Sequence, residues 1–369
     1  MSNPVLEGKK VAIVCDWLTG IGGAERVVLE LHKMFPDAPI YTSQYSPDKI
    51  DWFKDANIRT GWLQKLPSGL KKFLPVFRAI YFSNLDLSEY DLIISECGAE
   101  AKSVKFGKNT VHISIVNAPI HYYWSRYDQY IKEPGFGALN WLARIGLKIF
   151  VGPMRKWDYK AAQRPTEIIA ISTHIQREIK KYYRRDSEVI FPPVNTKRFR
   201  NNKTETRSGL VVTGRQTPYK RIDLAVKACT KLNLPLKVLG DGPEHQRLKE
   251  IAGPTVEMIR NPSDEEVTNY LSRAEGFIFP GLDDFGISAV EALASGLPVL
   301  AFRGGGPLDF IFPGKNGDFF DEQTEKSITE ALSMFNPKNY STREITKIAQ
   351  EFSEEEFRKN VLKFIESKI

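Results

Sequence analysis

The sequence predicts an α/β protein built from two doubly wound domains, and two observations support this fold class. Residues 275–307 contain an apolar run, a glycine-containing turn, a segment with helical spacing and a second apolar run. A buried strand that leads into a helix and then into another buried strand is typical of a parallel sheet covered by helices. The same pattern occurs on both sides of Pro192 and Pro193, which favour an extended crossing between domains. We therefore expect two such domains that face each other across a cleft.

Within residues 275–307, the expected strands are residues 276–280 and 297–302. A helix is expected to begin near Ile287 and to stop at Gly296. The apolar residues that recur at helical spacing are Ile287, Val290, Leu293 and Ala294.

The start of this helix has two features that suggest chemistry. Gly286 precedes it, at a point where free backbone N–H groups and the positive end of the helix dipole favour anions. Asp283 lies in the loop and Glu291 about one turn into the helix, with seven residues between them. Carboxylates in these places can accept hydrogen bonds from sugar hydroxyls. The alternative is an ordinary helix-terminal charge with a capping aspartate.

Composition and charge exclude several classes of protein. Hydrophobic residues make up 42% of the 369 residues and charged residues 26%, which is typical of a globular protein. No apolar run reaches the roughly 18–20 residues that cross a bilayer, and no signal-peptide pattern opens the chain, so we expect a cytoplasmic protein. The three cysteines lack metal-ligand spacing. The net charge of +7 fits phosphate-bearing small molecules or an anionic membrane. Nucleic acid is not expected, because no zinc-finger or RNA-binding signature is present.

The first half begins with an expected strand, a glycine-rich loop at residues 16–26 and a helix over residues 27–35. The loop contains Gly20, Gly22 and Gly23. A glycine loop at a helix N-terminus lets the backbone approach phosphate, although a tight strand-to-helix turn is the alternative. The expected strands of this half are residues 9–15, 40–43, 90–95, 110–116, 167–172 and 189–191.

Two of these strands end in polar segments, residues 96–102 and 117–124. Because ligands of open α/β sheets collect at the carboxyl ends of strands, Lys102 and Asn117 are candidate site residues. His112 falls within a strand and is expected in the core.

Residues 61–85 and 139–157 mix basic side chains with aromatic and aliphatic ones at helical spacing. This mixture suits helices that lie in a membrane interface, whereas a core-packed helix with a solvated lysine face is the alternative. In the first stretch these residues are Trp62, Lys65, Lys71, Lys72, Phe73, Phe77, Arg78, Tyr81 and Phe82. In the second they are Trp141, Arg144, Ile145, Leu147, Lys148, Ile149, Phe150, Arg155 and Lys156.

In the second half, Arg215 and Lys220 are the most prominent pair of cations. Both lie in the loop that follows the expected strand 209–213. An arginine fork and a lysine point charge together match a diphosphate, whereas two solvated surface cations are the alternative. The other expected elements are strands at residues 236–243 and 256–259, helices at 264–273 and 353–367, and a capping box formed by Ser353 and Glu356.

Taken together, these motifs resemble the retaining glycosyltransferases of family 4, which have the GT-B fold of two Rossmann-like domains. The matching segments, in chain order, are GIGGAER, GRQTPYKRID, VLGDGP, NPSDEEV, FPGLDDFGISAVEALASGLPVLAF and GGGPLDF. They extend over nearly the whole chain and look most like bacterial mannosyltransferase-type members that act on polysaccharide or lipid-linked glycans. The resemblance implies an acceptor-binding domain at residues 1–192, a nucleotide-sugar-binding domain at 193–350, and a C-terminal helix at 351–369 that packs back towards the first domain.

The resemblance also implies a reaction, namely transfer of a hexosyl group from a nucleoside-diphosphate sugar without a metal or other cofactor. Arg215 and Lys220 would bind the diphosphate and stabilise the departing nucleoside diphosphate, and Asp283 would contact the donor sugar. A phosphate oxygen, rather than a protein base, would assist the acceptor hydroxyl. The other implied donor contacts are Glu291 at the ribose, the backbone of Phe285, Gly286 and Ile287 at sugar and phosphate, Gly22 and Gly23 near the diphosphate, and Arg260 near the nucleobase.

Three residues depart from the family pattern. Asp283 is one methylene shorter than the family's glutamate, Asn117 replaces a histidine, and His121 replaces an arginine. We expect an active enzyme in the cytoplasm, with peripheral binding to the inner face of the plasma membrane as the alternative location. Asn117, His121 and Lys102 are the candidates for contact with the acceptor or the sugar. A catalytically impaired nucleotide-sugar-binding protein, or a GT-B phosphorylase or epimerase, are the alternatives.

Overall fold

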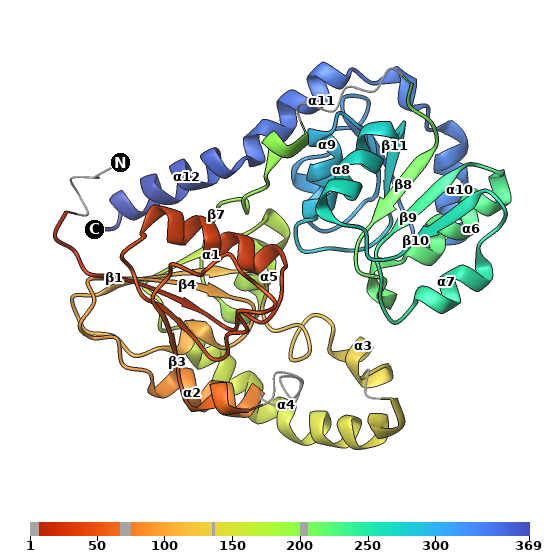
Figure 1. Cartoon of the computed structure of the whole chain (residues 1–369). Coiled ribbons are helices and arrows are strands. Elements are labelled where there is room, and N and C mark those ends of the chain that lie inside the picture. The colour runs from red at the N-terminus through yellow and green to blue at the C-terminus, as the bar shows by residue number, and fades with distance from the viewer. Residues whose placement is uncertain (1–6, 67–74, 135–136, 200–205) are drawn as a thin grey trace. The chain divides into compact units, whose positions relative to one another are not determined.

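The computed structural model describes residues 7–66, 75–134, 137–199 and 206–369. The chain divides into two compact units, each built around its own parallel sheet (Figure 1). Unit 1 consists of Met1–Phe191 with Arg358–Ile369, and unit 2 consists of Pro192–Phe357. The prediction of an α/β protein with two parallel sheets is therefore confirmed.

The sheet of unit 1 has seven strands in the order β3-β2-β1-β4-β5-β6-β7, and every pairing is parallel. Its central strands are almost completely buried, and most of their residues are apolar. Their register places Cys15 beside Glu96, and Cys97 beside Val116. The strands are β1 (Val11–Cys15), β2 (Ile40–Thr42), β3 (Ile58–Thr60), β4 (Leu92–Cys97), β5 (Val111–Val116), β6 (Glu167–Ala170) and β7 (Glu188–Val189).

Helices pack on this sheet through two apolar clusters. In one cluster, Phe82 of α2 packs with Ala12, Val14 and Ile93 of the sheet. In the other, Ala79 of α2 and Met154 of α4 share a core. The helices are α1 (Gly23–Met34), α2 (Pro75–Asn84), α3 (Tyr127–Lys132), α4 (Asn140–Ala162) and α5 (Thr173–Tyr183), with the short 3-10 helices η2 (Trp62–Lys65) and η4 (Ala101–Ser103).

The sheet of unit 2 has six parallel strands in the order β10-β9-β8-β11-β12-β13. One face is covered by α6 and α10, whose apolar residues form a single core with Leu210, Val238 and Ile278. The strands are β8 (Leu210–Thr213), β9 (Leu236–Leu239), β10 (Val256–Ile259), β11 (Gly276–Phe279), β12 (Val299–Phe302) and β13 (Gly317–Phe320). The helices are α6 (Ile222–Leu232), α7 (His245–Ile251), α8 (Asp264–Arg273), α9 (Ile287–Ala294), α10 (Glu325–Met334) and α11 (Thr342–Ala349).

The last helix, α12 (Glu354–Glu366), starts in unit 2 and belongs to unit 1 from Arg358 onward. At its start, the Ser353 hydroxyl accepts a hydrogen bond from the backbone N–H of Glu356, 3.3 Å away. Further along, Arg358 forms an ion pair with Glu30 of α1. Lys368, after the helix, lies 3.3 Å from the Glu167 carboxylate. The C-terminal segment is thus held to unit 1 by charged pairs as well as by its buried apolar residues.

Candidate functional site

Glycine-rich loops leave the carboxyl ends of the central strands of unit 2, and they interlock at one edge of the sheet. A Cβ atom on Gly240 would lie 2.3 Å from the carbonyl oxygen of Gly214, and Gly240 has a φ of +128°. Only glycine allows the loops after β8 and β9 to approach this closely. The sheet edge is therefore built so that several backbones converge on a small area.

Gln216 fixes the loop after β8, a role that no sequence pattern predicts. Its side chain is fully buried, donates to the Gly240 carbonyl at 2.9 Å and meets Nδ1 of His245 at 2.8 Å. Its backbone N–H donates to the Asp241 carbonyl at 2.8 Å. Because a buried amide is costly to leave unpaired, this network holds the segment between Arg215 and Lys220 in one position.

Lys220 and Asp283, two of the predicted catalytic residues, form an ion pair. Lys220 ends a short 3-10 helix (Pro218–Lys220), and Asp283 lies in the loop after β11. Burial lowers the pKa of Lys220, but the adjacent Asp283 carboxylate, together with Tyr219 and Asp284, more than offsets this effect, so the pKa lies above its usual value. The ammonium group is thus held in its charged form at the sheet edge.

The loops after β11 and β12 also pack on each other. The carbonyl of Asp283 accepts a hydrogen bond from the N–H of Gly306 at 2.9 Å, and a Cβ atom on Gly305 would lie 2.2 Å from that carbonyl. The side chain of Phe285 is buried and packs edge-on against Phe310, with ring centroids 5.5 Å apart. These contacts fix the backbone that leads into α9. Gly286 caps this helix with a φ of +105°, and Ile287 is its first residue.

Glu291 of α9 is paired with Arg198, a residue that the sequence analysis did not single out. One guanidinium nitrogen of Arg198 lies 3.3 Å from the Glu291 carboxylate, and another lies 2.6 Å from Asp264. Its Nε is buried and has no hydrogen-bond partner among the described residues. Arg198 therefore orients the carboxylate that we predict at the ribose.

Arg215 and Arg260 both lie at the same edge and are exposed. Arg215 follows β8 directly after Gly214. Arg260 follows β10, and its Nε lies 2.8 Å from the Asp241 carboxylate. The hydrogen bond from Arg260 holds the pKa of Asp241 below its usual value. The predicted site residues of unit 2 thus follow three strands, β8, β10 and β11, or lie on α9.

The remaining predicted residues belong to unit 1. Gly22 caps α1 and Gly23 is its first residue, so this helix begins earlier than the predicted Val27. Asn117 follows β5, and its amide donates a hydrogen bond to the Glu96 carboxyl group. His121 lies four residues further on, with Nδ1 2.9 Å from the Ser125 hydroxyl.

Carboxylates gather beneath Asn117. Asp16 accepts four backbone hydrogen bonds of 2.7–2.8 Å from residues 98–101. Glu96 is 3% exposed. Burial raises its pKa to about 8, and the nearby charges of Asp16 and Glu25 add to this effect. A neutral carboxylic acid at this position can hold the Asn117 amide at ordinary pH.

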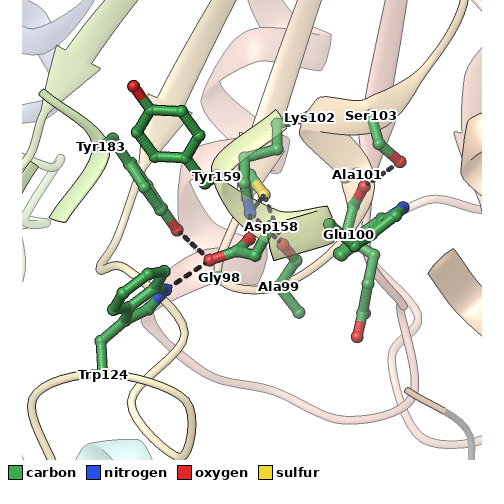
Figure 2. A network of polar contacts seen from close by, with 12 residues as sticks. Gly98, Ala99, Glu100, Ala101, Lys102, Ser103, Trp124, Asp158, Tyr159 and Tyr183 are labelled. Atoms are coloured by element: carbon green, nitrogen blue, oxygen red, sulfur yellow. Dashed lines mark hydrogen bonds and ion pairs between the residues drawn. The ribbon is translucent and has the colours of Figure 1, made fainter. Parts of the chain in front are cut away.

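Lys102 was predicted to contact the acceptor or the sugar, but its side chain is buried. Its side chain is 2% exposed, its ammonium lies 2.7 Å from the Asp158 carboxylate, and it donates to the Ala99 carbonyl at 2.5 Å. Figure 2 shows that Trp124 and Tyr183 donate to the same carboxylate. Lys102 is therefore part of the interior of unit 1, because its direction is set by packing and not by its place after a strand.

His112 is fully buried, as predicted for a core residue, and burial lowers its pKa to about 3. Among the residues that the structure describes, no group of three or more His, Cys, Asp and Glu side chains is placed to hold a metal ion.

Comparisons with known proteins find a family model that matches most of the second unit. Residues 193–352 match the family described as glycosyl transferases group 1. The chain is 25% identical over 177 residues to an uncharacterized glycosyltransferase from Methanocaldococcus jannaschii, covering 47% of this chain and 50% of that protein. It is 32% identical over 109 residues to a GDP-mannose-dependent alpha-mannosyltransferase from Corynebacterium glutamicum, covering 29% and 26%. The chain thus spans half or less of the length of these curated relatives.

A solved structure supports the fold over the whole chain. The Anabaena protein HepE, in complex with UDP and glucose, matches with a TM-score of 0.67 over 97% of this chain and 100% of that chain, at 15% identity. The predicted GT-B fold is therefore confirmed. No helix in the described part of the chain is long and apolar enough to cross a membrane.

Proposed function

We propose that this chain, in which residues 193–352 are a domain of the glycosyl transferases group 1 family, transfers a hexosyl group from a nucleoside-diphosphate sugar to an acceptor hydroxyl. The acceptor is a glycan or a lipid-linked glycan, and the transferred sugar is mannose from GDP-mannose. The observation that carries this proposal is the Lys220–Asp283 pair at the carboxyl edge of the unit 2 sheet, beside the N-terminus of α9.

Lys220 is suited to stabilise the leaving group. An ammonium group has three donors, so it can bind a phosphate oxygen while it keeps one hydrogen bond to Asp283. Arg215, which is exposed on the same loop, supplies a planar guanidinium for the other phosphate. Preorganised cations placed where charge develops lower the barrier to breaking a bond between sugar and phosphate.

Asp283 and Glu291 are suited to bind hydroxyl groups of the donor. Both are carboxylates already oriented by a basic partner, Lys220 for the first and Arg198 for the second. In our assignment Asp283 binds the donor sugar, Glu291 the ribose and Arg260 the nucleobase region. The backbone N–H groups at Phe285, Gly286 and Ile287 bind sugar and phosphate oxygens.

The reaction retains the configuration at the anomeric carbon and needs no protein base. The bond between the anomeric carbon and the phosphate oxygen breaks, and the acceptor oxygen forms its bond to the same face of that carbon. The acceptor proton passes to an oxygen of the departing diphosphate. We assign no metal to this step, and chelation by EDTA is therefore expected to leave the rate unchanged. In unit 1, Asn117 and His121 are the candidate contacts for the acceptor or the transferred sugar.

The test is a two-stage measurement with nucleotide sugars. Binding to the native state raises the melting temperature, so a thermal-shift screen of GDP-mannose, UDP-glucose and ADP-glucose identifies the donor. Release of nucleoside diphosphate is then followed with and without candidate acceptors, in the wild type and in Arg215→Ala and Lys220→Ala. Binding without release under every condition would indicate an impaired binding protein. Turnover that needs no glycosyl acceptor would indicate a phosphorylase or an epimerase.

A further inference from the structure

Most of the large apolar side chains that are exposed in the described part of the chain lie in two segments of unit 1. One segment is η2 with α2, and the other is α4 with the residue before it. Monomeric proteins rarely expose contiguous apolar surface of this kind unless it binds a partner or a membrane.

The first half of α4 has an exposed apolar stripe. Trp141, Ile145 and Ile149 follow one another at intervals of four, so they lie along one side of the helix, and Leu142 and Phe150 border them. These five side chains are between 47% and 62% exposed. The buried residues of α4 begin only at Met154. A helix in a globular protein normally buries its apolar stripe, and here the stripe faces outward.

The exposed face of α2 adds a second apolar area. Val76, Phe77 and Ile80 are 42–49% exposed, and Trp62 of η2 meets Phe77 edge-on with ring centroids 6.0 Å apart. The opposite face of α2 is buried through Ala79 and Phe82.

The two helices are attached to each other within unit 1. The indole N–H of Trp157 on α4 donates to the Ser83 hydroxyl on α2 at 3.2 Å, and Ala79 and Met154 share one core cluster. Figure 1 shows α2 and α4 together on one side of the unit 1 sheet. We name the exposed side chains of η2, α2 and the first half of α4 the apolar face.

Within the two segments that carry the apolar face, the charged side chains have one sign. Residues 140–157 contain no Asp or Glu, and neither do residues 61–85. Arg144, Lys148 and Lys156 are exposed on α4. Arg78 must be removed from the predicted basic side chains, because it is buried and its Nε lies 2.7 Å from the Glu100 carboxylate. Lys71, Lys72 and Phe73 lie outside the described residues.

We propose that the apolar face docks onto the surface of an anionic lipid bilayer, with α4 lying in the plane of the interface. Tryptophans near aliphatic side chains, with lysine and arginine beside them and no acidic residue, match the boundary between headgroups and acyl chains. A bilayer fits better than a protein groove because the face is broad, spans two helices and is complementary in charge to anionic headgroups.

Docking of this face would bring the candidate acceptor contacts to the membrane. The segment after Asn117 packs directly on α4, since the Arg155 guanidinium donates to the Tyr123 carbonyl and the Trp124 indole donates to Asp158 at 2.6 Å. The inference that the acceptor contacts come to the membrane rests on the proposed function, and it favours a lipid-linked acceptor. The docking itself does not depend on catalysis.

The experiment is flotation of the purified full chain with vesicles of phosphatidylcholine alone or mixed with phosphatidylglycerol, without any nucleotide sugar. We expect binding to the mixed vesicles that weakens at high salt. The double variant Ile145→Glu/Ile149→Glu should lower the partition coefficient at least ~tenfold. Lys148→Gln and Lys156→Gln should each lower it about fivefold on phosphatidylglycerol only.

A control is Met334→Glu, which places one glutamate at an exposed apolar residue of α10 in unit 2 and should bind like the wild type. Melting curves verify that every variant is folded. As a second measurement, Ile149→Cys and Met334→Cys are labelled with an environment-sensitive fluorophore, since Cys15, Cys97 and Cys229 are buried. Only the label at residue 149 should shift to the blue when vesicles are added.

Two outcomes would overturn the proposal. In the first, the wild type does not float with phosphatidylglycerol vesicles at low salt, or the Ile145→Glu/Ile149→Glu variant floats as well as the wild type does. The other is a concentration-dependent dimer, detected by light scattering, that the same variant abolishes while vesicles remain unbound. That second result would assign the apolar face to a contact with another copy of the chain.

Discussion

Each unit contains a lysine–aspartate pair, and the two pairs differ in what surrounds them. Lys102 and Asp158 in unit 1 are at most 2% exposed, whereas Lys220 and Asp283 in unit 2 keep 19% and 18% of their side-chain surface exposed. Asp158 also receives hydrogen bonds from Trp124 and Tyr183.

The protein itself therefore satisfies the first pair, while the second lies at a sheet edge with room for another partner. A buried pair that is fully hydrogen-bonded stabilises one packing arrangement. A partly exposed pair can exchange some of its contacts for a ligand. Residue type and fold alone therefore do not distinguish a structural cation from a functional one.

The largest expected effect is on stability in unit 1. Lys102→Ala leaves the buried Asp158 carboxylate without its counter-charge and should lower the free energy of unfolding by about 3–5 kcal/mol, measured by urea denaturation. The double variant Lys102→Met/Asp158→Asn is neutral and keeps an acceptor for Trp124 and Tyr183, so it should recover most of the loss. Wild-type stability of Lys102→Ala would show that the pair is not structural.

The next effect is on turnover in unit 2. Lys220→Ala removes a cation from the leaving diphosphate and should lower kcat for nucleoside diphosphate release by roughly 10²–10³. Its stability should change by only about 1 kcal/mol or less, because the pair is partly exposed. Lys231→Ala, an exposed lysine on α6 in the same unit, is the control. Equal kcat values for Lys220→Ala and Lys231→Ala would remove Lys220 from the mechanism.

A smaller effect is expected at the partner carboxylate. Asp283→Asn keeps the shape but removes the charge that raises the pKa of Lys220. We expect kcat/KM to fall by roughly 10–100-fold, with a basic limb of the pH profile that moves to lower pH. Asp283→Glu restores the residue of the family pattern and should keep activity within about tenfold of the wild type. Loss of activity in both variants, with an unmoved pH profile, would contradict a purely electrostatic role.

The sequence predicted the central elements well because their signals are local. The strand, glycine turn and helix of residues 276–294 appear almost residue for residue as β11 and α9. The edge strands β3 and β13 were not predicted. β3 is Ile-Arg-Thr with one half-exposed and two exposed residues, so it shows no apolar pattern, and its pairing with β2 alone defines it.

The site was predicted in part for the same reason. Lys220 and Asp283 follow apolar runs, and their meeting at one sheet edge follows from the parallel topology. Gln216 and Arg198 were missed because their roles depend on contacts with residues far along the chain, at Gly240 and Glu291. No local pattern marks a neutral amide or a single arginine in a loop. The inward direction of Lys102 was likewise set by tertiary packing.

The last effect depends on pH and concerns Glu96, the buried carboxyl at the sheet edge of unit 1. Its pKa of about 8 in the folded protein lies above the ordinary value of 4.5. Between these values the folded protein holds a proton that the unfolded chain has released, so the contribution to stability is full below about pH 4.5 and is lost as pH rises through about 8. The slope is at most about 1.4 kcal/mol per pH unit.

Glu96→Gln cannot ionise, and its amide oxygen can still accept the hydrogen bond from Asn117. Its melting temperature should therefore rise relative to that of the wild type as pH increases from the acid to the alkaline end of this window. The charges of Asp16 and Glu25 oppose ionisation of Glu96 in the wild type. Glu89→Gln, an exposed residue of unit 1, should show no such divergence. Parallel melting curves for Glu96→Gln and the wild type across the window would mean that Glu96 is ionised in the folded protein. The edge of the unit 1 sheet would then carry one more negative charge, which would disfavour phosphate there and increase its difference from the cationic edge of unit 2.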